Sequence, residues 1–181
     1  MQYWIVLFRG INVGGNNIVP MKKLLEVLHN IGCQQVKTYI QSGNVLLKHA
    51  MSDKEAFRAV ICEQVTEAFG FKVNIMLLDF AAFRRAVSQN PFSVNDSEGK
   101  TLHLYFLNAQ AVKADLAGLA ASKKDSESYR IIEQVFYLHA PDGIGRSKLA
   151  LKAEKLLGVS ATARNWNTVK KLLVLSDENA D

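Results

Sequence analysis

Apolar runs of strand length alternate with amphipathic stretches of helical length along the first half of the chain. The runs predict strands at Trp4–Phe8, Val36–Ile40, Val45–His49 and Val73–Leu78. Apolar residues at i, i+3 and i+4 spacing predict one helix from Met21 to Ile31 and another whose apolar face extends from Phe57 to Phe69. The resulting order is β-α-β-β-α-β, which is the order of the ferredoxin-like fold.

Turn and capping residues support the predicted ends of these helices. Pro20 suits the first turn of a helix, because a first-turn residue needs no partner for its backbone N–H. The sequence Ser-Asp-Lys-Glu at 52–55 is typical of a capping box at the start of the second helix. Gly32 and Gly70 are suited to end the two helices in a left-handed conformation.

The same kind of pattern restarts after a polar segment at 90–100, which contains Pro91 and Gly99. Before this segment, Asp79 is expected to cap a short helix that carries Phe80, Phe83 and Val87. The strands predicted after it are Leu102–Leu107, Tyr129–Ile132, Val135–His139 and Val159–Ala163. The helices predicted after it are Ala111–Ala121, Lys148–Leu157 and Asn167–Leu175.

The whole pattern predicts an α+β protein built from two tandem ferredoxin-like halves. Each half is expected to form an antiparallel sheet with helices on one face. We place the first half at residues 1–78, a connecting helix and loop at 79–101, and the second half at 102–181. The second half includes the basic C-terminal helices.

Two loops of the first half should meet at one end of its sheet. The first and second strands are parallel in this topology and the third is antiparallel to both. The glycine- and asparagine-rich loop Gly10–Asn17 therefore lies beside the turn Gln41–Asn44. The candidate ligand-binding residues of this first loop cluster are Arg9, Gly10, Asn12, Gly14, Gly15, Asn16, Gln41, Ser42 and Asn44.

A second loop cluster is predicted where the third and fourth strands of the second half end. It combines the glycine-bearing loop at 143–148 with the segment at 164–167. Planar Arg side chains suit bidentate contacts with phosphate or carboxylate, and a Trp ring can stack on a base or a sugar. The candidate ligand-binding residues here are Gly145, Arg146, Ser147, Lys148, Arg164, Asn165, Trp166 and Asn167.

The net charge supports an anionic partner for the second cluster. The chain of 181 residues has a formal net charge of +5 and a pI of about 9.2. The window from Gly143 to Lys171 contains seven basic residues and only one acidic residue, Glu154. This basic segment suggests a phosphate, nucleotide or nucleic-acid partner, while a solvated helix face is an equally simple interpretation.

Several classes of protein do not fit the composition. The apolar runs are far too short to span a bilayer, and no basic segment precedes the first of them, so we expect a cytoplasmic protein without a membrane partner. Cys33 and Cys62 lack a paired spacing and are expected to be buried thiols. No metal site is predicted, because the four histidines lack ligand spacing.

No motif names a reaction. The loop at 143–148 lacks the glycine–lysine–hydroxyl order of a phosphate-binding loop, and no dinucleotide-binding glycine pattern is present. Ser42 and Ser147 have no histidine partner close in sequence, and His139 at a strand end is most simply structural. Catalytic residues and cofactors are therefore unassigned, and enzymatic activity stays open.

Four motifs together resemble the bacterial family called domain of unknown function 1697. They are Arg-Gly-Ile-Asn-Val-Gly-Gly-Asn-Asn at 9–17, Thr-Tyr-Ile-Gln-Ser-Gly-Asn-Val at 38–45, Gly-Ile-Gly-Arg-Ser-Lys at 143–148 and Ala-Thr-Ala-Arg-Asn-Trp-Asn-Thr-Val at 161–169. The resemblance extends from Trp4 to about Leu175. It implies a duplicated ferredoxin-like fold, but it implies no activity and assigns no site residues.

The position of the polar motifs favours one function over two others. Because these motifs lie in loops rather than along a surface stripe, we expect binding of a phosphorylated metabolite or a nucleotide by the two loop clusters. Nucleic-acid binding through the basic C-terminal half is the first alternative. A structural or protein-interaction role is the second. The sequence does not indicate an oligomeric state.

Overall fold

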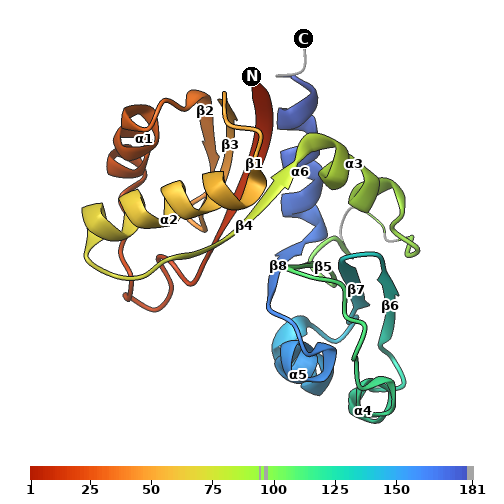
Figure 1. Cartoon of the computed structure of the whole chain (residues 1–181). Coiled ribbons are helices and arrows are strands. Elements are labelled where there is room, and N and C mark those ends of the chain that lie inside the picture. The colour runs from red at the N-terminus through yellow and green to blue at the C-terminus, as the bar shows by residue number, and fades with distance from the viewer. Residues whose placement is uncertain (94, 96–97, 179–181) are drawn as a thin grey trace. The chain divides into compact units, whose positions relative to one another are not determined.

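The computed structural model describes residues 1–93, 95 and 98–178 and confirms the predicted α+β class. Two four-stranded antiparallel sheets follow one another along the chain (Figure 1). The chain divides into two compact units. The first contains residues 1–84 and 172–181, and the second contains residues 85–171. The division falls within two helices, α3 (Phe80–Ser88) and α6 (Trp166–Asp177).

The first unit has the ferredoxin-like order β-α-β-β-α-β. Its strands are β1 (Gln2–Arg9), β2 (Gln34–Tyr39), β3 (Asn44–His49) and β4 (Asn74–Asp79). Its helices are α1 (Met21–Asn30) and α2 (Lys54–Phe69). The strand order is β2-β3-β1-β4, so β1 is central and pairs antiparallel with both β3 and β4.

The second unit repeats this order. Its strands are β5 (Leu102–Leu107), β6 (Ser128–Ile132), β7 (Val135–His139) and β8 (Ala161–Asn165). Its helices are α4 (Leu116–Ser122) and α5 (Lys148–Leu157). The 3₁₀ turn Ile144–Arg146 directly precedes α5. The strand order β6-β7-β5-β8 corresponds to that of the first sheet, with β5 in the central position.

Several predicted boundaries differ from the observed ones because capping overrides local propensity. The helix expected from Ala111 begins at Leu116, since the Asp115 side chain accepts a hydrogen bond from the Gly118 N–H at 2.8 Å. The second helix of the first unit is capped by Asp53, which accepts from the Ala56 N–H at 3.0 Å, rather than by Ser52. The expected loop at 90–100 lies partly outside the described residues.

The core of the first unit lies between its sheet and helices α1 and α2, which cover the same face (Figure 1). Trp4, Val6 and Phe8 point from β1 into this core. The alternate β1 residues Ile5 and Leu7 are also fully buried, so both faces of the central strand are covered. A strand buried on both faces reads as a continuous apolar run, which explains why 4–8 carries no polar residue.

The core of the second unit packs α4 and α5 against one face of the second sheet. Tyr105, Phe136 and Leu138 supply the sheet side of this core, and the buried face of α5 supplies the other side. On the opposite face, the Tyr137 hydroxyl donates a 2.7 Å hydrogen bond to the Ala86 carbonyl in α3. This buried bond ties the end of α3 to the sheet of the second unit.

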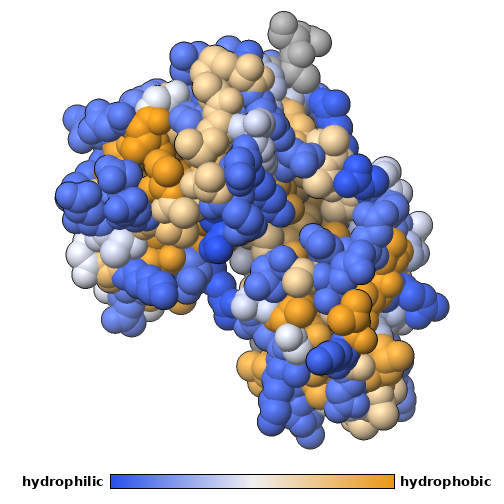
Figure 2. Space-filling view, in the orientation of Figure 1, coloured by the Kyte–Doolittle hydropathy of each residue, from blue (hydrophilic) through white to orange (hydrophobic). Residues whose placement is uncertain are grey.

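On the face shown in Figure 2, hydrophilic residues cover most of the area and hydrophobic residues appear as separate patches. Within the described residues, no helix is both long enough and apolar enough to cross a membrane.

The Tyr137 bond makes a direct stability prediction. Tyr137→Phe keeps the ring but leaves the buried Ala86 carbonyl without its donor, which is expected to cost about 1–3 kcal/mol of unfolding free energy. Urea unfolding of the variant and of the wild type measures the difference. Tyr129→Phe, at a half-buried tyrosine, is the control and should change stability by less than about 0.5 kcal/mol. Equal stability of the Tyr137 variant would contradict a structural role for the bond.

Candidate functional site

Asn12 joins the two loops of the first cluster. Its Nδ2 donates to the Gln41 carbonyl at 2.9 Å and to the Val19 carbonyl at 3.0 Å, and its Oδ1 accepts from the Val19 N–H at 2.7 Å. The backbone of Asn12 is left-handed, with φ of 54°. The expected juxtaposition of Gly10–Asn17 with Gln41–Asn44 is confirmed by this side chain.

Glycines shape both loops. Asn16 N–H donates to the Val13 carbonyl at 3.0 Å, and the two residues between them, Gly14 and Gly15, have positive φ values of 58° and 78°. Two consecutive positive φ angles are a property of type I′ turns and favour glycine. Gly43 allows a close approach instead, since a Cβ there would lie 2.6 Å from both Phe8 and Ile11.

Other amides of the first cluster also bond to the backbone. Asn44 is fully buried, and its Nδ2 donates to the Tyr39 carbonyl at 3.1 Å and the Ser42 hydroxyl at 2.9 Å. Asn17 Nδ2 donates to the Gly10 carbonyl at 2.9 Å. These amides hold the loops in shape. The cluster residues with exposed side chains are Arg9, Asn16, Gln41 and Ser42.

Helix α1 starts directly after the first loop. Its N-cap residue, Pro20, provides no side-chain hydrogen bond, and the first turn has no acidic residue. A helix start without such groups presents backbone N–H donors and the positive end of the helix dipole. This feature favours an anion rather than a cation near the first loop cluster.

The second loop cluster lies at the end of the second sheet where β7 and β8 finish. His139 in β7 is opposite Leu102, and Asn165 in β8 is opposite His103, at the start of the central strand. After β7, the loop reaches Ser147, which is fully buried and caps α5 by accepting from the Ala150 N–H at 3.0 Å. The neighbouring residues Gly145, Arg146 and Lys148 are exposed.

Residues 164–167 do not all share a face with that loop. Ala161 and Ala163 belong to the core that includes α5. Because side chains alternate along a strand, Arg164, which follows Ala163 and pairs with Leu104, lies on the opposite face of β8. Burial lowers the pKa of the Arg164 guanidinium to about 10, and its Nη1 donates to the Ala163 carbonyl at 2.9 Å. Arg164 is therefore half-buried and hydrogen-bonded to the backbone, whereas Arg146 is exposed.

The start of α6 has a capping role. Asn165 Oδ1 accepts from the Thr168 N–H at 2.9 Å. The backbone N–H of Trp166 donates to the Gly99 carbonyl at 3.0 Å. The Asn167 side chain lies so close to Gly99 that a Cβ at that position would collide with it. Trp166 and Asn167 are half-buried.

Lysines continue the basic surface along α5. Lys148, Lys152 and Lys155 are all exposed. Glu154, the one acidic residue of the helix, is turned inward, and its Oε1 accepts from the Ala161 N–H at 2.7 Å. The outer face of α5 is consequently positive without a nearby carboxylate on the same helix.

His103 is a titratable residue at the second cluster that the sequence did not single out. It lies near the start of β5, opposite Leu138 and Asn165. Burial lowers its pKa to about 4, while a hydrogen bond with the Thr101 backbone acts weakly in the opposite direction. Within the described part of the chain, its buried Nδ1 has no hydrogen-bond partner.

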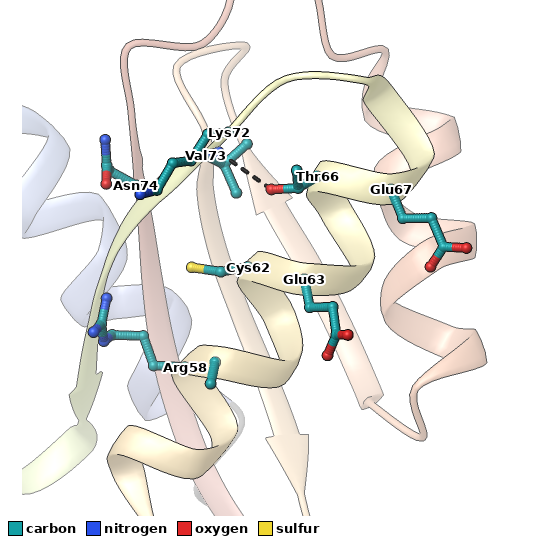
Figure 3. Close-up of a pocket in the computed structure, with 9 residues that line it drawn as sticks. Arg58, Cys62, Glu63, Thr66, Glu67, Lys72, Val73 and Asn74 are labelled. Atoms are coloured by element: carbon teal, nitrogen blue, oxygen red, sulfur yellow. Dashed lines mark hydrogen bonds between the residues drawn. The ribbon is translucent and has the colours of Figure 1, made fainter.

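The structure also contains an open pocket of about 870 Å³ in the first unit (Figure 3). It lies along α2 and the start of β4, and it was not predicted. Its lining residues are Arg58, Ala59, Cys62, Glu63, Thr66, Glu67, Lys72, Val73 and Asn74. No group of acidic, Cys and His side chains among the described residues is arranged to hold a metal ion.

Comparison with known proteins agrees with this architecture. The paired four-stranded sheets define a duplicated ferredoxin-like α+β protein. Residues 1–137 match the family described as "Protein of unknown function (DUF1697)", and the chain belongs to this family. The matched segment includes the first loop cluster and ends before the second. A search of curated proteins gave no match.

One solved structure of similar fold is "The structure of conserved bacterial protein SP0830 from Streptococcus pneumoniae". The two chains are 23% identical and superpose with a TM-score of 0.73. The alignment covers 97% of this chain and 98% of that chain. At this level of identity the likeness supports the fold alone.

The Asn12 contacts predict how the first cluster responds to mutation. Asn12→Ala removes three hydrogen bonds and leaves an alanine in the left-handed conformation at φ of 54°. We therefore expect a loss of about 3 kcal/mol of unfolding free energy. Asn12→Gly loses the same hydrogen bonds, but glycine adopts a positive φ without strain. This variant should therefore be about 1 kcal/mol more stable than Asn12→Ala. Thermal unfolding with Asn16→Ala as the exposed control tests the order. The reverse order would contradict the assignment.

His103 predicts a pH dependence of stability. Its folded pKa of about 4 lies below the ordinary value of 6.5, so the unfolded chain binds the proton more tightly. The contribution of His103 to the unfolding free energy is fully present above pH 6.5 and is lost as the pH falls toward 4. Between pH 7 and pH 4.5, the unfolding free energy measured with urea should fall by roughly 2–3 kcal/mol less in His103→Gln than in the wild type. An identical pH dependence would exclude this role.

Proposed function

We propose that this protein binds an anionic ligand, a phosphorylated metabolite or a nucleotide, and that the loop at 143–148 with the start of α5 is the main contact. The observation that carries the proposal is the charge arrangement. Arg146 and Lys148 are exposed on either side of the buried cap Ser147, while Glu154 is turned toward Ala161. An anion approaching this surface meets cations and helix-end N–H groups together.

The state of these cations supports the proposal. Within the described residues, neither Arg146 nor Lys148 takes part in an ion pair, and the ion pairs that the structure contains involve other cations, such as Arg84 with Asp177. A cation without a protein carboxylate does not have to exchange one partner for another when a ligand binds. The guanidinium of Arg146 can offer two parallel N–H groups, and Lys148 adds a point charge.

The first loop cluster is included in the proposal as a separate anion contact. Its asparagines are used to hold the loops, so we assign the ligand contact to the exposed Arg9 and Gln41 and to the backbone at the start of α1. A loop that is fixed before binding loses little conformational freedom on contact with a ligand. This arrangement supports binding without identifying the ligand.

Nucleic acid is a second candidate because of the spacing of lysines on α5. Lys148, Lys152 and Lys155 are at helical spacing on the exposed face and extend over roughly 10 Å at 1.5 Å per residue. This length exceeds the size of one phosphate group. A polyanion that follows the helix would bind with an affinity that falls steeply with salt.

Calorimetric titration with AMP and with pyrophosphate tests the proposal. Arg146→Ala and Lys148→Ala should each weaken binding by about tenfold or more, because each removes a charge-assisted contact worth roughly 1.5–3 kcal/mol. Lys37→Ala removes an exposed charge elsewhere, and Leu151→Ala changes the exposed face of α5 without changing its charge. Both control variants should bind as the wild type does.

The contradicting results are equally clear. Equal weakening by Lys37→Ala would show that only net charge matters, and absence of binding in the wild type would overturn the proposal. Tight binding of a single-stranded RNA that is steep in salt and is not displaced by AMP would favour the nucleic-acid candidate instead. In that case Lys152→Ala and Lys155→Ala should weaken RNA binding as strongly as Lys148→Ala does.

A further inference from the structure

Three aliphatic side chains of the first loop cluster are exposed at the surface. Val13 is 65% exposed, Ile18 57% and Ile40 52%, and they are three of the eight large apolar residues that are exposed in the described part of the chain. The loop after β1 also contains Ile11 and Val19, which are buried in the core of the first unit. The aliphatic residues here therefore form an inner pair that anchors the loop and an outer group of three.

The side chain of Asn12 connects the segments that carry this outer group. Val13 is the next residue along the chain. The Asn12 side chain bonds to the backbone of the residue after Ile18 at 2.7 and 3.0 Å, and to the carbonyl of the residue after Ile40 at 2.9 Å. Each exposed aliphatic residue is thus one position away from Asn12 or from a hydrogen bond that it makes. We call Val13, Ile18 and Ile40 the aliphatic patch.

Ile40 is held in a backbone conformation that is costly for its residue type. Its φ is 51°, in the left-handed region, where a β-branched residue is an outlier. The other non-glycine residues with positive φ in the described ranges are Asn, Gln and Glu, none of which is β-branched. Because the Ile40 side chain is exposed, packing within the unit does little to offset the strain. Backbone strain of this kind is typical of functional sites.

The segments around the aliphatic patch carry mainly positive charge. Neither Gly10–Pro20 nor Ile40–Gly43 contains a charged residue, and the exposed Arg9, Lys22 and Lys37 flank them in sequence. The chain has one acidic residue, Glu26, before position 53. A surface that complements these segments therefore has carboxylates around an apolar centre.

We propose that the aliphatic patch docks an acidic segment of a partner protein, in which aliphatic or aromatic side chains lie between the carboxylates. The apolar side chains of that segment cover Val13, Ile18 and Ile40, and its carboxylates face the flanking basic residues. An apolar centre with a polar rim is the usual anatomy of a protein interface. Loops that are already fixed by Asn12 lose little conformational freedom on docking.

The polar groups of the loops favour a protein partner over a lipid bilayer or a nucleic acid. Asn16, Gln41 and Ser42 are exposed in the same two loops as the aliphatic patch. A polypeptide can hydrogen-bond to these side chains, whereas the hydrocarbon of a bilayer would leave them unsatisfied. Neither loop contains an aromatic residue on which a base could stack.

A peptide array probed with the whole protein tests the proposal. One set of short peptides alternates Asp or Glu with Leu, Ile or Phe. A second set has Lys in place of the acidic residues, and a third has Ser in place of the apolar residues. Members of the first set should bind, with a saturable fluorescence-polarisation curve in solution. Their counterparts in the other two sets should bind at least about tenfold more weakly.

Substitutions in the aliphatic patch separate docking from folding. Val13→Ser and Ile18→Ser should each weaken binding of the acidic peptide about fivefold, without changing the melting temperature. Ile40→Asn should weaken binding similarly but raise the melting temperature by about 2–4 °C, because asparagine adopts the left-handed conformation more readily. Val112→Ser, at an aliphatic residue that is 81% exposed in the second unit, is the control and should have neither effect.

Four results would overturn the proposal. They are no binding by the acidic set, equal binding by the lysine or serine set, undiminished binding by all three patch variants, and a lower melting temperature of Ile40→Asn, which would give Ile40 a role in the fold. Binding of phosphatidylglycerol vesicles or single-stranded RNA, weakened by the same variants while the acidic peptides do not bind, would assign the aliphatic patch to lipid or nucleic acid instead.

The result is independent of the proposed anion site in the second unit. Arg146→Ala should leave binding of the acidic peptide unchanged, although it weakens binding of AMP. Conversely, Val13→Ser and Ile18→Ser should bind AMP as the wild type does. Failure of one proposal can therefore be distinguished from failure of the other.

Discussion

The antiparallel pairing of one central strand with two neighbours determines where every candidate site of this protein lies. β1 pairs with β3 and β4, and β5 pairs with β7 and β8. In the first unit, this pairing brings the loop after β1 to the turn between β2 and β3. In the second, it brings the ends of β7 and β8 to the same end of the sheet. Burial of Ile5 and Leu7 opposite Trp4, Val6 and Phe8 fixes the central strand of the first unit on both faces.

The two loop clusters use similar residues in different ways. In the first cluster, asparagines bond to the backbone, with Asn12 connecting two loops and Asn44 buried between Tyr39 and Ser42. In the second, Ser147 has the capping role and the charged neighbours Arg146 and Lys148 remain at the surface. Polar loop residues therefore hold the loop conformation in the first unit, whereas in the second unit they form a positively charged surface. This contrast is why we assign the main anion contact to the second.

The fold could be predicted from the sequence because periodicity and turn residues agree along most of the chain. The adjacency of the first two loops followed from topology alone, and the Asn12 contacts confirm it. The start of α4 could not be predicted, since the alanines before Asp115 have high helix propensity and the cap overrides it. The pocket was missed for a different reason: Arg58 and Lys72 are ordinary surface charges in the sequence, and only the packing of α2 beside β4 makes them part of one pocket lining. Burial of His103 likewise depends on tertiary packing, which the pattern of residues along β5 does not show.

The most direct measurement of the central claim is a map of backbone amide chemical shifts during titration of the whole protein with AMP. If the second loop cluster binds the phosphate, the largest shifts will fall on Ile144–Leu149, with smaller ones on the loop at 10–20. Shifts confined to the pocket residues 58–74, or distributed over exposed lysines throughout the chain, would contradict the assignment of the anion site to Arg146 and Lys148.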